Sequence, residues 1–208
     1  DIMLAEETGA RLHLCHCSTK ESVELVRDAK KKGIKVSGEV CPHHFTLTED
    51  DIVEGDANYK MNPPLRTKAD VDALKAGLRD DIMEVISTDH APHTAEEKAK
   101  DLKSAPFGIV GMETAAALTF TELVKTGYLT PMGMAEKMST NPARILGINK
   151  GDISVGHLAD ITIFDPKDTY EINAAEFASK GKNMPFEGRK VTGRVVGTIL
   201  DGRIVYQK

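Results

Sequence analysis

Residues 82–93 read Ile-Met-Glu-Val-Ile-Ser-Thr-Asp-His-Ala-Pro-His, an apolar run that leads directly into one carboxylate and two imidazoles. The apolar half predicts a short buried strand, and Pro92 ends it because proline has no N–H to give to a neighbouring strand. Asp89 is therefore expected at the carboxyl end of a strand, with His93 on the loop beyond it. Enzymes built from parallel strands and helices place their catalytic groups at this position. A solvated loop that happens to contain histidine would be the simpler interpretation if no similar cluster occurred elsewhere.

The segment belongs to a repeating pattern of strands and helices. Strands are predicted at residues 11–17, 34–41 and 81–88, separated by amphipathic helices, of which the first is capped by Ser18. This alternation is typical of parallel βα units and predicts an α/β fold. The later helices are predicted over residues 111–125 and, as two short helices, after Thr130-Pro131 and after Asn141-Pro142.

The composition changes near residue 148, where short strands replace the βα pattern. These strands are expected at residues 160–164, 191–200 and 203–206. Asp201-Gly202 is a typical hairpin turn between the last two strands. The sequence therefore predicts two domains, residues 1–147 with the functional site and residues 148–208 as a small β domain.

The bulk composition excludes several classes of function. The chain has 208 residues and a formal net charge of −5, and its single lysine run, at residues 30–32, is expected at a helix end. No basic surface for nucleic acid or an anionic membrane is therefore predicted. No apolar stretch approaches the roughly 20 residues that a membrane-spanning helix needs. The three cysteines are few and odd in number, which indicates reduced thiols and a cytoplasmic location.

Each of the three predicted parallel strands ends near a side chain that can bind a metal ion. These side chains are His16 after the first strand, His43 or His44 after the second, and Asp89 after the third. Since the carboxyl ends of parallel strands face one side of a barrel or sheet, the three are expected to share a pocket. Imidazole and carboxylate suit zinc, which lowers the pKa of bound water and so favours hydrolysis of an amide-like bond.

Each of these residues also has a simpler interpretation. A single strand histidine such as His16 is more often a core residue than a metal ligand. His43 and His44 are two candidates for one role, and the alternation of side chains along the strand favours His44. Asn62 would be an ordinary loop residue on composition alone, and His90 is assigned to the surface or to packing.

Five motifs, in order and with similar gaps, resemble those of the dihydroorotases, a family within the amidohydrolase superfamily. They are His16-Cys17-Ser18-Thr19, Cys41-Pro42-His43-His44, Asn62-Pro63-Pro64-Leu65-Arg66, Ser87-Thr88-Asp89-His90-Ala91-Pro92-His93, and residues 106–114, which begin Pro106-Phe107-Gly108. The resemblance covers nearly the whole chain and is to the carboxyl-terminal portion of that family.

The resemblance implies an enzyme that interconverts N-carbamoyl-L-aspartate and L-dihydroorotate in pyrimidine (UMP) biosynthesis. It implies a binuclear Zn²⁺ site in which His16 and His44 bind one ion, while Asp89 binds the other and acts as general base. It further implies a set of substrate contacts, namely Asn62, His93, Phe107 and Gly108.

One departure from the family pattern changes the expected architecture. The His-x-His pair of the first barrel strand and the carboxylate of the fourth have no counterpart in this chain. A complete (β/α)₈ barrel needs about 250 residues, so residues 1–147 suit only strands five to eight of a TIM-type barrel. The expectation is a carboxyl-terminal half-barrel with a small β-sandwich tail, inactive alone, which needs an amino-terminal half. The complete enzyme is expected to be a homodimer.

Two alternatives remain from the sequence. A hydantoinase or allantoinase would share the metal ligands but not the substrate loops. A non-catalytic dihydroorotase-like protein could serve as a structural partner, for instance of aspartate transcarbamoylase. The intact His16, His44, Asp89 and His93 argue against loss of activity in this half.

Overall fold

The computed structural model describes all residues from 1 to 208 and contains two separate sheets. The first is parallel, with β1 (Leu12–Leu14), β2 (Val36–Val40) and β3 (Val85–Ile86) in that order. A further parallel bridge joins His90 to Ile109 beyond β3. The predicted α/β pattern of parallel strands is therefore confirmed, although all three strands are shorter than the ranges predicted for them.

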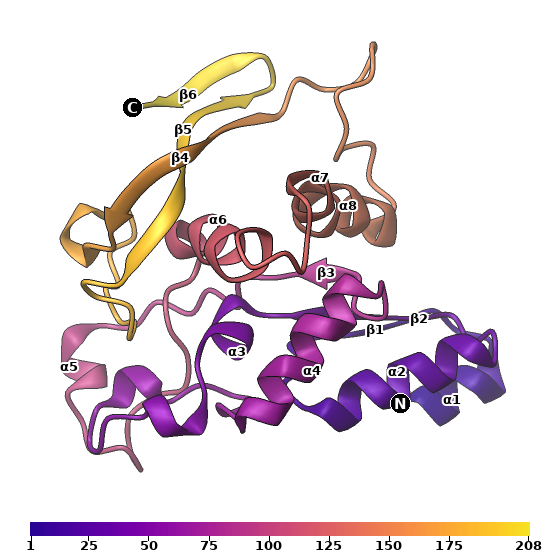
Figure 1. Ribbon diagram of the computed structural model, residues 1–208, viewed down its shortest axis with the longest axis horizontal. Helices are drawn as coiled ribbons and strands as arrows, with labels where there is room; N and C mark the ends of the chain where they lie inside the picture. The colour runs from indigo at the N-terminus through magenta and orange to yellow at the C-terminus, as the bar shows by residue number, and fades with distance from the viewer.

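Eight α-helices connect and cover these strands (Figure 1). They are α1 (Ile2–Thr8), α2 (Lys20–Lys31), α3 (Pro42–Thr46), α4 (Lys68–Arg79), α5 (Ala95–Lys98), α6 (Met112–Thr119), α7 (Pro131–Ala135) and α8 (Asn141–Leu146). Short 3₁₀ turns occur at Glu49–Asp51, Ala57–Tyr59 and Ala174–Glu176.

Helices α2 and α4 run side by side and bury one face of the parallel sheet (Figure 1). Their apolar stripes share one core cluster with β2 and Met83, and this cluster includes Val23, Val26, Leu74 and Leu78. The cap of α2 is Thr19, whose hydroxyl accepts from the Ser22 N–H, so the prediction of Ser18 was one residue early. Val36 and Val40 of β2 belong to this cluster, whereas Ser37 and Glu39, which alternate with them and face the opposite side, are only partly buried.

π-helical turns occur in both helical segments after β3. The helix predicted over residues 111–125 is found over residues 112–124, whereas the two short helices predicted after it are joined into one segment. Phe120–Val124 continues α6 in this form, and Glu136–Thr140 links α7 directly to α8. Thr140 has helical angles, φ −63 and ψ −47, so the prediction of two separate short helices was wrong. The wider turn suits Pro142, which has no N–H for the regular helical bond and crowds the preceding turn.

The chain after residue 147 forms one antiparallel sheet of β4 (Ile161–Glu171), β5 (Lys190–Leu200) and β6 (Arg203–Gln207). A sandwich needs two packed sheets, so this chain does not build the predicted β-sandwich by itself. Figure 1 places the sheet beyond α6, and residues of the tail share a second core cluster with that helix. The cluster includes Ile109, Val110, Leu118, Ile172, Met184, Phe186 and Val191. None of the helices is long and apolar enough to cross a membrane.

A buried lysine connects the π-helical turn Glu136–Thr140 to the segment that leads into β3. Lys137 is 2% exposed, and its Nζ donates to Asp81 Oδ1 at 2.6 Å and to the Met83 carbonyl at 3.2 Å. We expect Lys137→Met to lower the free energy of unfolding by about 1.5–3 kcal/mol, because hydrogen bonds of a buried charged group are lost. Denaturant unfolding measures this. Lys31→Met is the control, since its pair with Asp28 is mostly exposed and contributes less than about 1 kcal/mol; equal losses would contradict the prediction.

Candidate metal and substrate site

Two of the predicted metal ligands, His16 and Asp89, have an unusual backbone conformation. His16 follows β1 with φ 39, and Asp89 follows β3 with φ 47. Few residues other than glycine adopt positive φ, although Asp, Asn and His tolerate it better than most. Such conformations cost free energy and cluster at functional sites, where the surrounding structure holds them. Here they occur at two candidate metal ligands at the same end of the parallel sheet.

Glu39 on β2 holds the backbone of His16. Its Oε1 accepts from the His16 N–H at 3.2 Å, and its Oε2 lies 3.0 Å from His13 Nε2. His13 Nδ1 in turn lies 2.8 Å from the Ser37 hydroxyl. Glu39 was not predicted as a site residue, although Ser37 and Glu39 alternate along β2 and mark a polar face of the strand. Glu39 therefore stabilises the turn on which His16 stands.

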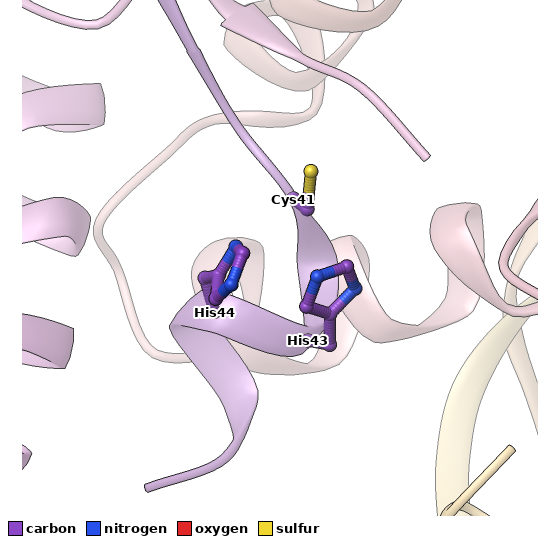
Figure 2. A group of neighbouring side chains, drawn as sticks. All are labelled: Cys41, His43 and His44. Atoms are coloured by element: carbon purple, nitrogen blue, oxygen red, sulfur yellow. The ribbon is translucent and has the colours of Figure 1, made fainter. Parts of the chain in front are cut away.

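The second strand leads into a buried cluster of Cys41, His43 and His44 (Figure 2). The candidate ligand atoms of these three side chains lie within 4.8 Å of one another, and Figure 2 shows both imidazoles on the turn after the strand. His43 and His44 lie on α3, which begins at Pro42, so the alternation of side chains along β2 ends before both of them. Proline at the first helical position explains the change. Strand alternation therefore does not distinguish the two histidines.

The protonation of His44 follows from its contact with a backbone carbonyl. His44 Nε2 lies 2.8 Å from the Pro63 carbonyl oxygen, which can only accept, so Nε2 carries the proton. Burial lowers the pKa of His44 to about 4, so its other nitrogen keeps a free lone pair at neutral pH. That Nδ1 is buried without a hydrogen-bond partner, as is His43 Nε2. Buried, unpartnered imidazole nitrogens fit a divalent metal ion, which neutral imidazole binds.

The structure does not gather His16, His44 and Asp89 into one compact group. Two groups of donor atoms lie within 4.8 Å of one another, Cys41 with His43 and His44, and His13 with Cys15 and Glu39. His16 and Asp89 lie outside both groups, yet they influence the pKa values of residues in the first group. Burial is the main cause of the lowered pKa of His44, and His16 lowers it further. Burial likewise raises the pKa of Cys41, and the charge of Asp89 adds to the increase.

The predicted substrate contacts lie on three loops near this end of the sheet. His93 and Phe107 are in direct contact, because His93 Nε2 donates to the Phe107 carbonyl at 2.9 Å. The Phe107 side chain is exposed, whereas Gly108 is buried with φ 110. Asn62 is exposed on the loop that carries Pro63, the partner of His44. The structure therefore joins the 93 and 107 loops directly, and connects the Asn62 loop to α3.

Two lysines that the sequence analysis missed hold the 103–108 loop. Lys60 Nζ donates to the carbonyls of Lys103 and Ala105 at 3.1 and 2.5 Å, and lies 4.4 Å from the Phe107 ring centre. Lys98 Nζ donates to the carbonyls of Pro106 and Gly108 at 3.1 and 3.0 Å. Burial, followed by the charge of Lys60, lowers the pKa of Lys98. No motif marked these lysines, because their role depends on a loop that folds back onto them.

His90 also has a defined structural role. Its Nδ1 accepts from the backbone N–H groups of Gly111 and Met112 at 3.1 and 3.3 Å, where α6 begins. The first N–H groups of a helix lack partners within the helix, so the imidazole serves as a cap. The assignment of His90 to packing rather than to the chemistry agrees with this contact.

A sequence model of the amidohydrolase family matches residues 1–205. The chain belongs to the amidohydrolase family. Among curated proteins it is 53% identical over 207 residues to a dihydroorotase of Pelotomaculum thermopropionicum, and 51% identical over 208 residues to one of a Geobacillus species. Both alignments cover 100% of this chain but only 48% and 49% of the relatives. This family member therefore spans about half the length of the curated relatives it matches, and its resemblance to dihydroorotases is confirmed.

Solved amidohydrolase structures have the same fold. A dihydropyrimidinase from Brevibacillus agri superimposes with a TM-score of 0.93 at 30% identity, covering 99% of this chain and 47% of that protein. An L-hydantoinase from Arthrobacter aurescens gives 0.91 at 32% identity, covering 100% and 47%. The amidohydrolase architecture is therefore shared with enzymes whose sequences are considerably less similar than those of the dihydroorotases.

Proposed function

We propose that this chain is part of a dihydroorotase, which interconverts N-carbamoyl-L-aspartate and L-dihydroorotate in pyrimidine biosynthesis. The observation that carries the proposal is the identity of 51–53% to dihydroorotases along the whole chain. The dihydropyrimidinase and L-hydantoinase structures match the fold with TM-scores of 0.93 and 0.91, but at only 30% and 32% identity. Shared fold with lower identity indicates common metal chemistry and a different substrate.

The proposal includes an architecture that this chain only partly builds. Residues 1–147 would form strands five to eight and the helices of a (β/α)₈ barrel, and residues 148–208 a β domain whose second sheet comes from elsewhere. An amino-terminal half would complete both. Exposed apolar side chains on α1 and α2 support such a contact with the amino-terminal half. Met3, Leu4 and Leu25 are 76%, 62% and 61% exposed. Three free cysteines, two of them buried, support the proposed cytoplasmic location.

His16, His44 and Asp89 are the residues that would hold zinc, in a binuclear site completed by ligands of the other half. A divalent ion bound there would lower the pKa of a water molecule and polarise the amide carbonyl of the substrate. The neutral, unpartnered Nδ1 of His44 and the turns that carry His16 and Asp89 support this assignment. His43 lies beside His44 with an equally buried free nitrogen, so the exchange of either histidine tests which one binds.

Asp89 would move the proton during the reaction. In the hydrolytic direction its carboxylate takes a proton from the attacking water and returns it to the ring nitrogen as the amide bond breaks. His93 and Asn62 would bind the substrate's carboxylate and ring substituents, while the backbone of Phe107 and Gly108 contacts the ring edge. The contact between His93 and the Phe107 carbonyl already aligns two of these groups before substrate arrives.

The metal assignment gives a direct prediction for His16. We expect His16→Asn to lower the bound zinc of the complete enzyme by about one ion per site, with loss of activity, because an imidazole ligand is removed. Asparagine is chosen since it tolerates the positive φ of this position. Elemental analysis of the purified protein measures zinc, and His157→Asn in the tail is the control. Unchanged zinc in His16→Asn would exclude His16 as a ligand.

Substrate preference tests the proposed function itself. The chain is combined with its amino-terminal half and assayed with dihydroorotate, hydantoin and allantoin under the same conditions. We expect turnover of dihydroorotate alone; preference for hydantoin or allantoin would replace the proposal by one of those activities. Loss of all three activities with zinc still bound would favour the structural-partner role, for which aspartate transcarbamoylase is the candidate. Size-exclusion chromatography of the same material tests the proposed homodimer.

A further inference from the structure

Asn183 lies on the tail between β4 and β5, yet its side chain is buried against the loops that carry the candidate site. It is 6% exposed, and it follows Gly181 and Lys182 in a short irregular segment. No motif of the family resemblance includes it. Its contacts nevertheless link three segments that are distant in sequence.

Every hydrogen-bonding atom of the Asn183 side chain is engaged with these loops. Nδ2 donates to the carbonyls of Ala91 and Gly108, both at 3.1 Å, and Oδ1 accepts from the His93 N–H at 2.9 Å. The Asn183 backbone carbonyl accepts from the Val110 N–H at 2.9 Å. The two carbonyl partners can only accept and the N–H can only donate, so the orientation of the amide is determined.

The segments around Asn183 approach one another closely at two glycines. A Cβ atom added at Gly181 would lie 2.8 Å from Pro92 Cβ and 2.9 Å from Asn183 Oδ1. A Cβ at Gly108 would lie 2.4 Å from Ala91 Cβ. Residues 89–93, 106–110 and 181–183 therefore pack as one unit, with the Asn183 amide at its centre.

We propose that Asn183 is a positioning residue that fixes the loop of Asp89 and His93 against the loop of Phe107 and Gly108. This inference rests on the proposed function, in which the first loop supplies the base and the second the ring contacts. Asn183 has no free polar atom for a substrate, so it acts through these loops and not by contact. Through Asn183, the tail helps to set the relative position of the two loops.

The test compares two variants of different chemistry in the complete enzyme. Asn183→Asp keeps the size and the acceptor for His93 N–H, but its carboxylate cannot donate to the Ala91 and Gly108 carbonyls. Asn183→Ala removes all three bonds. We expect both to lower kcat/KM for dihydroorotate by about 10²-fold, the typical effect of a shift of about 1 Å at a reacting group. If packing alone mattered, Asn183→Asp would match the wild type, which would overturn the proposal.

Asn173→Ala is the matched control, because Asn173 lies on the same tail, is exposed and caps only a 3₁₀ turn. It should leave kcat/KM unchanged. Zinc content should equal that of the wild type in all three variants. A loss of zinc in the Asn183 variants would mean that the effect passes through the metal, against the proposal.

Hydrogen exchange gives a readout that does not depend on the reaction. The His93 amide should exchange faster in Asn183→Ala, while Asn183→Asp, which keeps Oδ1, should leave it slow. If the wild type does not turn over dihydroorotate, the proposed function fails while this exchange pattern still tests the role of Asn183. Unchanged exchange at His93 in Asn183→Ala would overturn the positioning role.

Discussion

Asp89→Asn should reduce the proposed dihydroorotase activity of the complete enzyme by about 10²–10⁴-fold, the usual contribution of a general base, which is the role proposed for Asp89. The amide cannot accept the proton, and it is a weaker metal ligand than the carboxylate. Asparagine nearly matches aspartate in shape and tolerates the φ of 47 at this position, so the backbone should not move. Steady-state kinetics with dihydroorotate measures the loss.

The control for this variant is Asp201→Asn. Asp201 also has positive φ, at 49, but lies exposed in the hairpin turn between β5 and β6. It should retain wild-type kcat and KM, which shows that exchanging an aspartate in this conformation is harmless by itself. Wild-type activity of Asp89→Asn would remove Asp89 from the mechanism.

Gly108→Ala should lower kcat/KM for dihydroorotate by about 10²-fold, because it displaces the loop that carries the proposed ring contacts. Position 108 has φ 110, a conformation that costs a non-glycine residue on the order of 1–3 kcal/mol. The added Cβ would also lie 2.4 Å from the Cβ of Ala91, which no rotamer change can relieve. The loops of residues 89–93 and 106–110 would have to separate.

Two further variants distinguish the clash from the backbone strain. Gly127→Ala has a comparable φ of 82 with no atom within 4 Å of the new Cβ, so it should lose stability but not activity. Ala91→Gly combined with Gly108→Ala removes the clashing atom and should restore part of kcat/KM. If the double variant is no better than Gly108→Ala, contact between these loops is not what limits activity.

The sequence predicted the parts of the site that depend on local pattern. The strand pattern before His16 and before Asp89 was sufficient to place both at carboxyl ends, because alternation and turn residues act over a few positions. The same pattern was not sufficient for His44. Pro42 starts a helix there, since proline is favoured at the first helical position, so the alternation of β2 ends before His43 and His44.

Contacts between distant segments could not be predicted from this one sequence. Asn183 meets Ala91 and Gly108 only after the tail has packed on α6, and nothing near residue 183 indicates that partner. The role of Lys60 and Lys98 likewise depends on their hydrogen bonds to carbonyls of the 103–108 loop, which is distant in sequence from Lys60 and folds back onto both. The β-sandwich prediction depended on a second sheet, which the residues of this chain do not supply.

The apolar cluster that joins the tail to α6 has a consequence for protein engineering. Ile172, Phe186 and Val191 of the tail pack with Ile109 and Leu118, so the interior surface is shared between the two parts. Residues 148–208 are therefore a poor unit for exchange between family members. A chimera with a hydantoinase tail must also carry the matching side chains of α6 and of the loop before it. Otherwise the transplanted sheet will pack poorly against side chains that belong to another sequence.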